Sequence, residues 1–395
     1  MTSFDPIVIC SYARTPIGGF QGALSSIKAT ELGAVAVRAA LERAELAPGK
    51  VEQIIMGCVL PAGLGQAPAR QTALRAGLPL SVGATTVNKM CGSGLQAAVM
   101  AHDALKAGSA DIIVAGGMES MSNAPYLMAK HRGGARIGHD VISDSMYLDG
   151  LEDAYEPGRL MGAFAEDTAR EYQFTRKAQD EFAVGSLTNA KQAVESGAFA
   201  REITPVQTTT RRGIEIISSD EQPSKADLSK IATLKPAFDK NGTITAANAS
   251  SISDGAAALV MTRESVAKKL GLPIVAKILA HASHAHEPAK FATAPVPAMR
   301  KALIKAGWSE DDVHLFEVNE AFAVVAMIAA KELSIPRKRL NVHGGACALG
   351  HPIGASGARL IATLISALER TGGKRGLASL CIGGGEAVAM AVELA

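Results

Sequence analysis

Cysteines and long hydrophobic runs are scarce in this chain. Its 395 residues include five cysteines and no Cys-x-x-Cys pair, which argues against a disulfide framework and a structural zinc site and predicts free thiols. No apolar run reaches the roughly 18 residues that span a bilayer. The start of the chain, Met1 to Pro6, lacks the charged segment and apolar core of a signal peptide. We therefore expect a soluble, cytoplasmic protein that does not enter a membrane.

An excess of charge of either sign is also missing. The chain has 40 basic and 38 acidic residues and a net charge of +2, so it creates no field for wrapping nucleic acid, although a local basic cluster can still hold a phosphate-bearing small molecule. With 48% hydrophobic residues, a chain of this length can bury more than one core. Two or more domains are expected, and nucleic acid is not an expected partner.

The two ends of the chain repeat one pattern. A helical pattern that ends near Leu41 leads to an apolar strand, Gln53 to Met56, and a similar pattern after Leu303 leads to the strand Leu315 to Val318. Apolar strands separated by helices indicate sheets that are covered on both faces. Together with the repetition, they predict two duplicated α/β halves.

The repeat continues with a helix, a strand and a glycine turn in each half. In the first half, the predicted helix 94–107 is followed by a strand from Ile112 that is expected to turn at Gly116-Gly117. In the second half, the predicted helix 357–368 is followed by a strand that turns after Cys381. The duplication therefore extends over most of both halves.

A segment without a counterpart in the second half separates the two. It is rich in charges and glycines and contains single amphipathic helical patterns, such as 175–198. We interpret it as an inserted loop domain, since long excursions of this kind are usually functional. The predicted domains are residues 1–120 with 250–272 for the first half, 121–249 for the insertion and 273–395 for the second half.

Two cysteines stand in glycine-rich turns next to apolar strands. Cys91 lies at a strand-to-helix turn, where free N–H groups and the helix dipole favour the thiolate, so it is a candidate nucleophile. A buried, inert cysteine is the alternative. Cys381 precedes three glycines, and their N–H groups can bind an oxyanion. A tight turn without chemistry is the alternative there.

Near the second cysteine lies His351, between Gly350 and Pro352. Imidazole holds and passes a proton near neutral pH, and this turn is too rich in glycine for ordinary core packing. A thiol, an imidazole and a second thiol together predict acyl-transfer chemistry.

Other polar candidates are less distinctive. Asn319 follows the strand Leu315 to Val318, and a plain helix N-cap is its alternative interpretation. Cys10, Cys58 and Cys347 have no glycine cradle, so we expect them to be small apolar fillers.

In these motifs the chain resembles the thiolases, the family of acetyl-CoA acetyltransferases and 3-ketoacyl-CoA thiolases. The matching segments are Asn88-Lys89-Met90-Cys91-Gly92-Ser93-Gly94, Gly116-Gly117-Met118-Glu119-Ser120-Met121-Ser122, Asn248-Ala249-Ser250, Asn319-Glu320-Ala321-Phe322, Gly350-His351-Pro352 and Cys381-Ile382-Gly383-Gly384-Gly385. The resemblance implies a five-layered αβαβα fold of two duplicated halves with an inserted loop domain.

The resemblance also implies catalytic roles. Cys91 would accept the acyl group after His351 activates it, and Cys381 would remove or return the α-proton of the second acetyl-CoA. The N–H groups of Cys91 and Gly383 would hold the oxygen of the acyl-enzyme thioester. The enolate oxygen would be held by His351 and by a water that Asn319 fixes.

Coenzyme A would lie mainly on the insertion, as the resemblance implies. No permanently bound cofactor and no metal ion are expected, because the coenzyme A thioesters are the substrates. For Arg212 and Lys225, a solvated surface side chain is the alternative. The implied contacts are Leu160, Met161, Ala246, Ser250 and Phe322 for coenzyme A, Phe291 and Met161 for the acyl pocket, and Arg212 or Lys225 for the nucleotide end.

Three departures from the family pattern bear on substrate choice. Leu160 stands where short-chain members commonly have a histidine, and Phe291 stands where many members have a methionine. Gly385-Glu386-Ala387 stands where the family has a Gly-x-Gly ending after Cys381, a change that would stiffen this turn without touching the thiol. These changes leave the reaction intact and bear on the length of the acyl chain.

The expected activity is the interconversion of two acetyl-CoA with acetoacetyl-CoA and CoA. A broader 3-ketoacyl-CoA thiolase of fatty-acid breakdown is the main alternative. A decarboxylating ketoacyl synthase would have a second histidine in place of Asn319, and a non-catalytic acyl-CoA binder would have lost one of Cys91, His351 or Cys381.

The family forms dimers and tetramers, so the resemblance implies a homotetramer. The segment 126–140 is the candidate for a tetramer-forming loop, and a solvated basic loop is the alternative. Its basic residues are Lys130, His131, Arg132 and Arg136.

Overall fold

A computed structural model describes residues 5–210 and 213–395. The main sheet contains two sets of strands. The first set is β1 (Ile7–Arg14), β3 (Gln53–Gly57), β4 (Gly83–Val87), β5 (Ile112–Ser120) and β10 (Ser253–Arg263), with the short β2 (Gly18–Gly19) paired to β10; the second is β11 (Ala276–Ala285), β12 (Leu315–Val318), β13 (Arg375–Ile382) and β14 (Glu386–Leu394).

The strand order repeats in the two sets. The order across the whole sheet is β12-β13-β14-β11-β1-β10-β5-β3-β4. In each set a parallel pair, β3 with β5 or β12 with β13, continues into two antiparallel pairings. The sets join where β1 pairs with β11 at Val8↔Lys277 and Ile9↔Ala276. The duplication predicted from the sequence is therefore present in the sheet.

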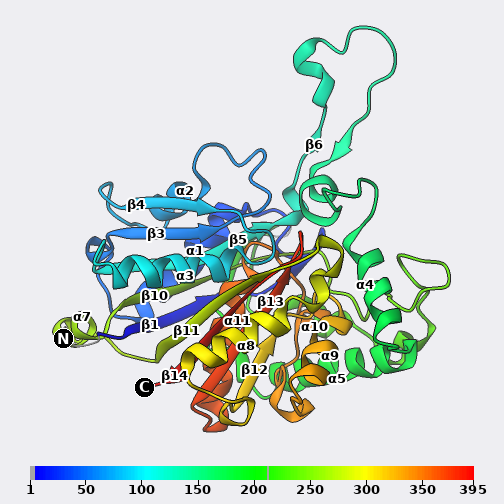
Figure 1. Ribbon diagram of the computed structural model, residues 1–395. Coiled ribbons are helices and arrows are strands. Elements are labelled where there is room, and N and C mark those ends of the chain that lie inside the picture. Colours follow the sequence, from blue (N-terminus) through cyan, green and yellow to red (C-terminus); the bar gives the residue numbers. More distant parts are fainter. Residues whose placement is uncertain (1–4, 211–212) are drawn as a thin grey trace.

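The helices cover the strands in layers. Three apolar cores are separated by the two sets of strands: one contains α1 and α2, the middle one contains α3 and α11, and the third contains α8 and α9. Helices and strands thus alternate in five layers, as expected, with α3 and α11 in the centre (Figure 1). The helices are α1 (Ala29–Arg43), α2 (Pro68–Arg75), α3 (Ser93–Lys106), α7 (Glu264–Leu270), α8 (Pro295–Ala306), α9 (Ala323–Glu332), α10 (Ala346–Leu349) and α11 (Ser356–Thr371).

The segment between β5 and β10 has its own elements. In Figure 1 the hairpin that contains β6 extends away from the body, whereas α4 and α5 lie beside α9 and α10. The predicted helix 175–198 is α5. Among the described residues, no helix is both long and apolar enough to cross a membrane. The elements are β6 (Tyr126–Leu127), β7 (Ser143–Asp144), α4 (Met161–Glu171), α5 (Arg176–Glu195), β8 (Val206–Thr210), β9 (Gly213–Ile217) and α6 (Glu221–Lys225).

The expected turn at Gly116-Gly117 is wrong, because β5 continues through both glycines to Ser120. A Cβ atom on Gly117 would lie 2.0 Å from the carbonyl oxygen of Gly354, and one on Gly116 would lie 2.2 Å from that of Ala257. The glycines therefore serve a close approach of neighbouring backbones within the strand and not a change of chain direction.

Replacement of Gly117 by alanine tests this packing. The new methyl group overlaps the backbone of the loop after His351, so we expect Gly117→Ala to lower stability by about 1–3 kcal/mol, the usual cost of overpacking a core. The measurement is the melting temperature Tm. Gly49→Ala is the control, because a Cβ atom at Gly49 would meet nothing within 4 Å. Equal melting temperatures for the two variants would contradict the packing argument.

Candidate active site

The turns that carry Cys91 and His351 meet because two helices cross at glycines. α3 begins two residues after Cys91, and α11 begins five residues after His351. A Cβ atom on Gly357 would lie 2.2 Å from the backbone nitrogen of Leu95, and one on Gly94 would lie 2.9 Å from that of Ala358. The helix starts are therefore in backbone contact, and they hold both turns at one place.

The turn after β13 joins them from the second half. A Cβ atom on Gly92 would lie 2.4 Å from Cδ1 of Ile382, so the two cysteine turns pack directly on each other. The backbone N–H of Gly383 lies close enough to the sulfur of Cys91 to lower the pKa of this thiol. Lys89 and Glu386 form an ion pair across the same junction. Glu386, in the ending that departs from the family pattern, thus ties the second turn to the first.

Unusual backbone conformations adjoin all three candidate groups. Met90, before Cys91, has φ +46°, and Gly350, before His351, has φ +105°. Gly384 and Gly385, after Cys381, have φ +91° and +85°. Glycine adopts this region freely, but for Met90 it stores strain of about 1–3 kcal/mol, a feature that clusters at functional sites.

Burial favours the protonated form of both thiols. Burial raises the pKa of Cys91 to about 11, although the N–H groups of Gly383 and of Cys91 itself act in the opposite direction. Burial and the nearby Cys91 raise the pKa of Cys381, which also places the two thiols close together. The N–H groups at the start of α3 favour the thiolate of Cys91, as expected, but desolvation has the larger effect on its pKa.

His351 is buried and neutral, and the hydroxyl of Ser356 fixes which of its ring nitrogens carries the proton. Burial, and then the charge of Arg359, lower its pKa to about 3. Its Nδ1 lies 2.6 Å from Oγ of Ser356, and this hydroxyl donates to the carbonyl oxygen of Pro352 at 2.9 Å. Because the single hydroxyl proton is committed to Pro352, Nδ1 carries a proton and Nε2 holds the free lone pair.

Asn319 lies beside this imidazole. Its Nδ2 is 3.4 Å from Nδ1 and 3.5 Å from Nε2 of His351, and its Oδ1 accepts from Nη2 of Arg359 at 3.3 Å. The alternative interpretation as a helix N-cap is wrong, because α9 is capped at Phe322.

The sequence interpretation missed Arg359, which is buried and also pairs with Glu317 at 3.3 Å. In the sequence, Arg359 is a charged residue inside an apolar helical run. Because charged residues are almost never fully buried without a partner, this position indicated a buried ion pair.

Glu119 is a second group that the sequence interpretation missed. Its carboxylate accepts from the N–H groups of Val59, Leu60 and Gly354 at 3.0, 3.1 and 2.8 Å. Burial raises its pKa to about 7, against the effect of these donors. Glu119 thus fastens the loop after His351 to the end of β3.

Two of the expected filler cysteines have polar partners instead. Cys58 Sγ donates to Oε1 of Glu119 at 3.7 Å, and Cys347 Sγ donates to the carbonyl oxygen of Glu320 at 3.6 Å. Cys58 nevertheless lies in the apolar core beneath α1, as expected for a filler, whereas Cys347 belongs to no apolar core cluster among the described residues. The expectation is confirmed for Cys10, which is buried in the apolar core beneath α1.

The predicted acyl-pocket residues share one apolar cluster with Cys381. Phe291 is only 2% exposed and meets the Phe322 ring edge-on at 6.2 Å, and Met161 packs against the same cluster. Met161 also lies 3.9 Å from the Cβ position at Gly383. The insertion therefore reaches the thiols through the start of α4.

The remaining predicted coenzyme A contacts are spread more widely. Ser250 donates its N–H to the carbonyl oxygen of Ala321 at 2.9 Å, next to Phe322. Leu160 is half-buried and Ala246 is exposed. Lys225 is exposed and pairs with Glu221. Arg212 lies outside the described residues.

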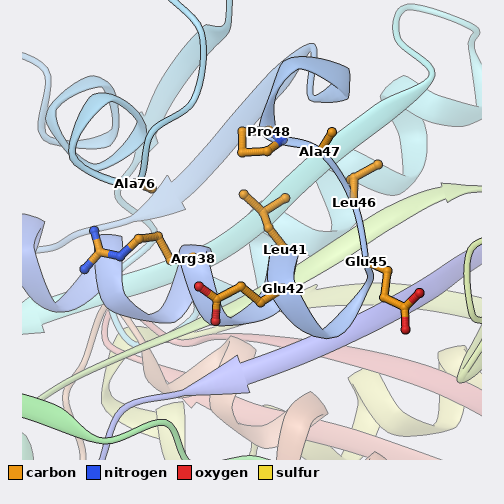
Figure 2. Close-up of a pocket in the computed structure, with 8 residues that line it drawn as sticks. All are labelled: Arg38, Leu41, Glu42, Glu45, Leu46, Ala47, Pro48 and Ala76. Carbon is orange, nitrogen blue, oxygen red and sulfur yellow. The ribbon is translucent and has the colours of Figure 1, made fainter.

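A surface hollow lies apart from these groups. Figure 2 shows it at the end of α1, where Arg38, Glu42 and Glu45 surround the apolar Leu41 and Leu46. None of its eight lining residues is a cysteine or a histidine. The hollow therefore takes no part in the thiol–imidazole arrangement.

Known proteins share this sequence and fold over their full length. The thiolase N-terminal domain matches residues 7–265, and the thiolase C-terminal domain matches residues 272–394. The chain is 50% identical to an acetyl-CoA acetyltransferase of Cupriavidus necator over 98% of this chain and 99% of that one. It is 49% identical to acetyl-CoA acetyltransferase 2 of Arabidopsis thaliana over 99% and 98% of the two chains.

A solved structure matches over the full length of the chain. The crystal structure of the Bacillus anthracis acetyl-CoA acetyltransferase superposes with a TM-score of 0.97, at 39% sequence identity and with all of both chains covered. The matched family domains, the full-length relatives and the duplicated five-layered fold agree, and this chain therefore belongs to the thiolase family.

Proposed function

We propose that this enzyme interconverts two molecules of acetyl-CoA with acetoacetyl-CoA and CoA through an acetyl group on Cys91. The observation that carries the proposal is the convergence of Cys91, His351 and Cys381, with the N–H of Gly383 directed at the Cys91 sulfur. The full-length relatives named acetyl-CoA acetyltransferase support the same activity.

In the first step, the sulfur of Cys91 attacks the thioester carbonyl of acetyl-CoA. Its proton passes to Nε2 of His351, the nitrogen that Ser356 leaves free. The N–H groups of Cys91 and Gly383 hold the oxyanion, and a donor of this kind is worth about 3–4 kcal/mol. Cys381 gives its proton to the departing CoA sulfur, so this step leaves acetyl-Cys91, a Cys381 thiolate, an imidazolium and free CoA.

In the second step, the Cys381 thiolate removes the α-proton of another acetyl-CoA. The imidazolium of His351 and a water on Asn319 hold the enolate oxygen while the enolate carbon attacks acetyl-Cys91. The Cys91 sulfur leaves and takes the proton from His351, so both thiols and the neutral imidazole are restored. The raised pKa values of both thiols fit this cycle, because each sulfur is ionised only while a partner holds its proton.

Arg359 is the positioning residue of this scheme. By donating to Oδ1 of Asn319 it directs the amide nitrogen toward His351, which leaves the amide one orientation in which to bind the water. The positive charge of Arg359 also keeps the pKa of the buried imidazole low.

The acyl pocket supports short chains. Phe291 is buried in the cluster that contains Cys381, and Phe322 and Met161 close the neighbouring space. A benzyl side chain buried there takes up space near Cys381 that a longer acyl chain would need. We propose that Phe291 restricts the enzyme to acetyl transfer and that coenzyme A enters along Met161, Leu160 and Ser250, with Ala246 and Lys225 farther out.

The hairpin of β6 and β7 supports a homotetramer. It exposes Tyr126, Ile137, Val141 and Ile142, and Ile137 is 98% exposed. Apolar side chains gathered on an arm that leaves the body are typical of a surface that another chain covers. A cytoplasmic location and a role in fatty-acid metabolism stay predictions.

Cysteine variants test the division of labour. We expect Cys91→Ala to abolish incorporation of labelled acetyl groups into the protein. Cys381→Ala should still be acetylated but lose condensation by about 10²–10⁴-fold, the usual value of a general acid–base group. The control, Cys10→Ala, removes a buried thiol outside the site. Normal condensation by Cys381→Ala would refute the acid–base role, and loss of acetylation in both variants would do so as well.

A series of 3-ketoacyl-CoA substrates tests the pocket by CoA-dependent cleavage. We expect kcat/KM to fall by about tenfold or more per added pair of methylenes beyond the four-carbon substrate, because a filled apolar pocket discriminates by this amount. Phe291→Ala should relax the preference, whereas Phe199→Ala, at a buried ring in another cluster, should not. Comparable rates on six-carbon and longer substrates would favour the broader 3-ketoacyl-CoA thiolase instead.

The mass of the protein in solution tests whether the hairpin of β6 and β7 forms a tetramer. We expect four chains per particle by sedimentation, and a dimer for Ile137→Asp, because a buried unpaired charge disrupts an apolar interface. Ile214→Asp is the control, since Ile214 is 69% exposed on a different hairpin. A dimeric parent protein would contradict the proposal.

A further inference from the structure

Two histidines and an aspartate meet far from the thiols. His102 and Asp103 lie in the last turns of α3, and His281 lies on β11. Nδ1 of His102 is 2.8 Å from Oδ1 of Asp103, Nε2 of His281 is 3.0 Å from the same oxygen, and the two nitrogens are 3.2 Å apart. The three atoms form a triangle with edges of nearly equal length.

Hydrogen bonds account for at most two edges of this triangle. If both ring nitrogens carry a proton, both N–H groups donate to Oδ1 of Asp103, and the 3.2 Å edge between the two nitrogens has no hydrogen bond. If both nitrogens are unprotonated, three lone pairs face one another at this place. A cation at the centre of the triangle would bind all three lone pairs at once.

The dimensions fit a metal ion. At a metal–ligand distance of about 2.1 Å, adjacent ligands are about 3.0 Å apart in an octahedron and about 3.4 Å apart in a tetrahedron. The observed edges match one face of such a polyhedron, and the two rings meet edge-on with centroids 4.8 Å apart. Asp103 is exposed, so water can complete the coordination.

We propose that His102, Asp103 and His281 bind one Zn²⁺ ion per chain. Two imidazoles and one carboxylate favour Zn²⁺, Co²⁺ or Ni²⁺ over Mg²⁺ and Ca²⁺, which prefer oxygen ligands alone. The ion fastens the end of the central helix α3, in the first half, to β11, in the second half. It is separate from the acyl-transfer groups, and the proposal does not depend on the proposed function.

Titration of the full-length enzyme with Co²⁺ tests the site. The protein is first stripped with a chelator and desalted. We expect one Co²⁺ per chain with visible d–d absorption, displacement of that absorption by Zn²⁺, and a higher Tm with either ion. His281→Ala and Asp103→Asn should each weaken binding by about tenfold or more.

The matched control is His284→Ala, on the same strand, where the ring contacts Lys301 at 3.1 Å. It should bind Co²⁺ as the parent does. Absence of saturable binding at millimolar Co²⁺ would overturn the proposal. So would equal binding by the parent and His281→Ala, or a loss of binding in His284→Ala alone, which would place the ion elsewhere on this histidine-containing strand.

Discussion

The backbone contact between α3 and α11 at Gly94 and Gly357 is the constraint on which the site depends. Any side chain at either position would push the helices apart, and with them the turns that carry Cys91 and His351. The same column of contacts extends into the sheet, because Cβ atoms on Gly57 and Gly117 would meet the carbonyl oxygen of Gly354. Glycine loses more chain entropy on folding than other residues. At these positions it is required nevertheless, because only glycine lets the helices approach closely enough to hold the nucleophile near its base.

Buried charges hold the insertion against this frame. Arg14 of β1 pairs with Glu202 and Asp220, both in the insertion, at 2.7 Å, and Thr363 of α11 donates to Glu202 at 3.3 Å. Loss of one partner from such a fully buried set costs about 3–5 kcal/mol, because an unpaired charge remains. The segment that carries Met161 therefore has a fixed relation to the middle helices, and a substrate bound on it meets the thiols in one orientation.

Local patterns in the sequence were sufficient for the elements and for the three turns of the site. The predicted helices 94–107 and 357–368 correspond to α3 and α11 within three residues, and the predicted strand Leu315 to Val318 is β12. Gly116 and Gly117 were misinterpreted because glycine serves turns and close backbone approaches alike. Arg359 and Glu119 were not recognised as parts of the site. A charged residue in a buried segment indicates that it has a partner, but the sequence does not show which residue that partner is. The same holds for His102 and His281, which are 179 residues apart.

The sequence by itself determined the duplicated halves, the family and the identity of the groups that meet at the thiols. Only the tertiary structure decided their protonation states and orientations. Position at a helix start favours a thiolate at Cys91, yet burial raises the pKa to about 11, and the choice of Nε2 on His351 comes from the hydroxyl of Ser356. The desolvation of a group depends on all the residues that pack around it, and the tautomer of a histidine depends on a hydrogen-bond partner that folding brings close. The residues next to the group in the chain therefore determine neither its pKa nor its tautomer.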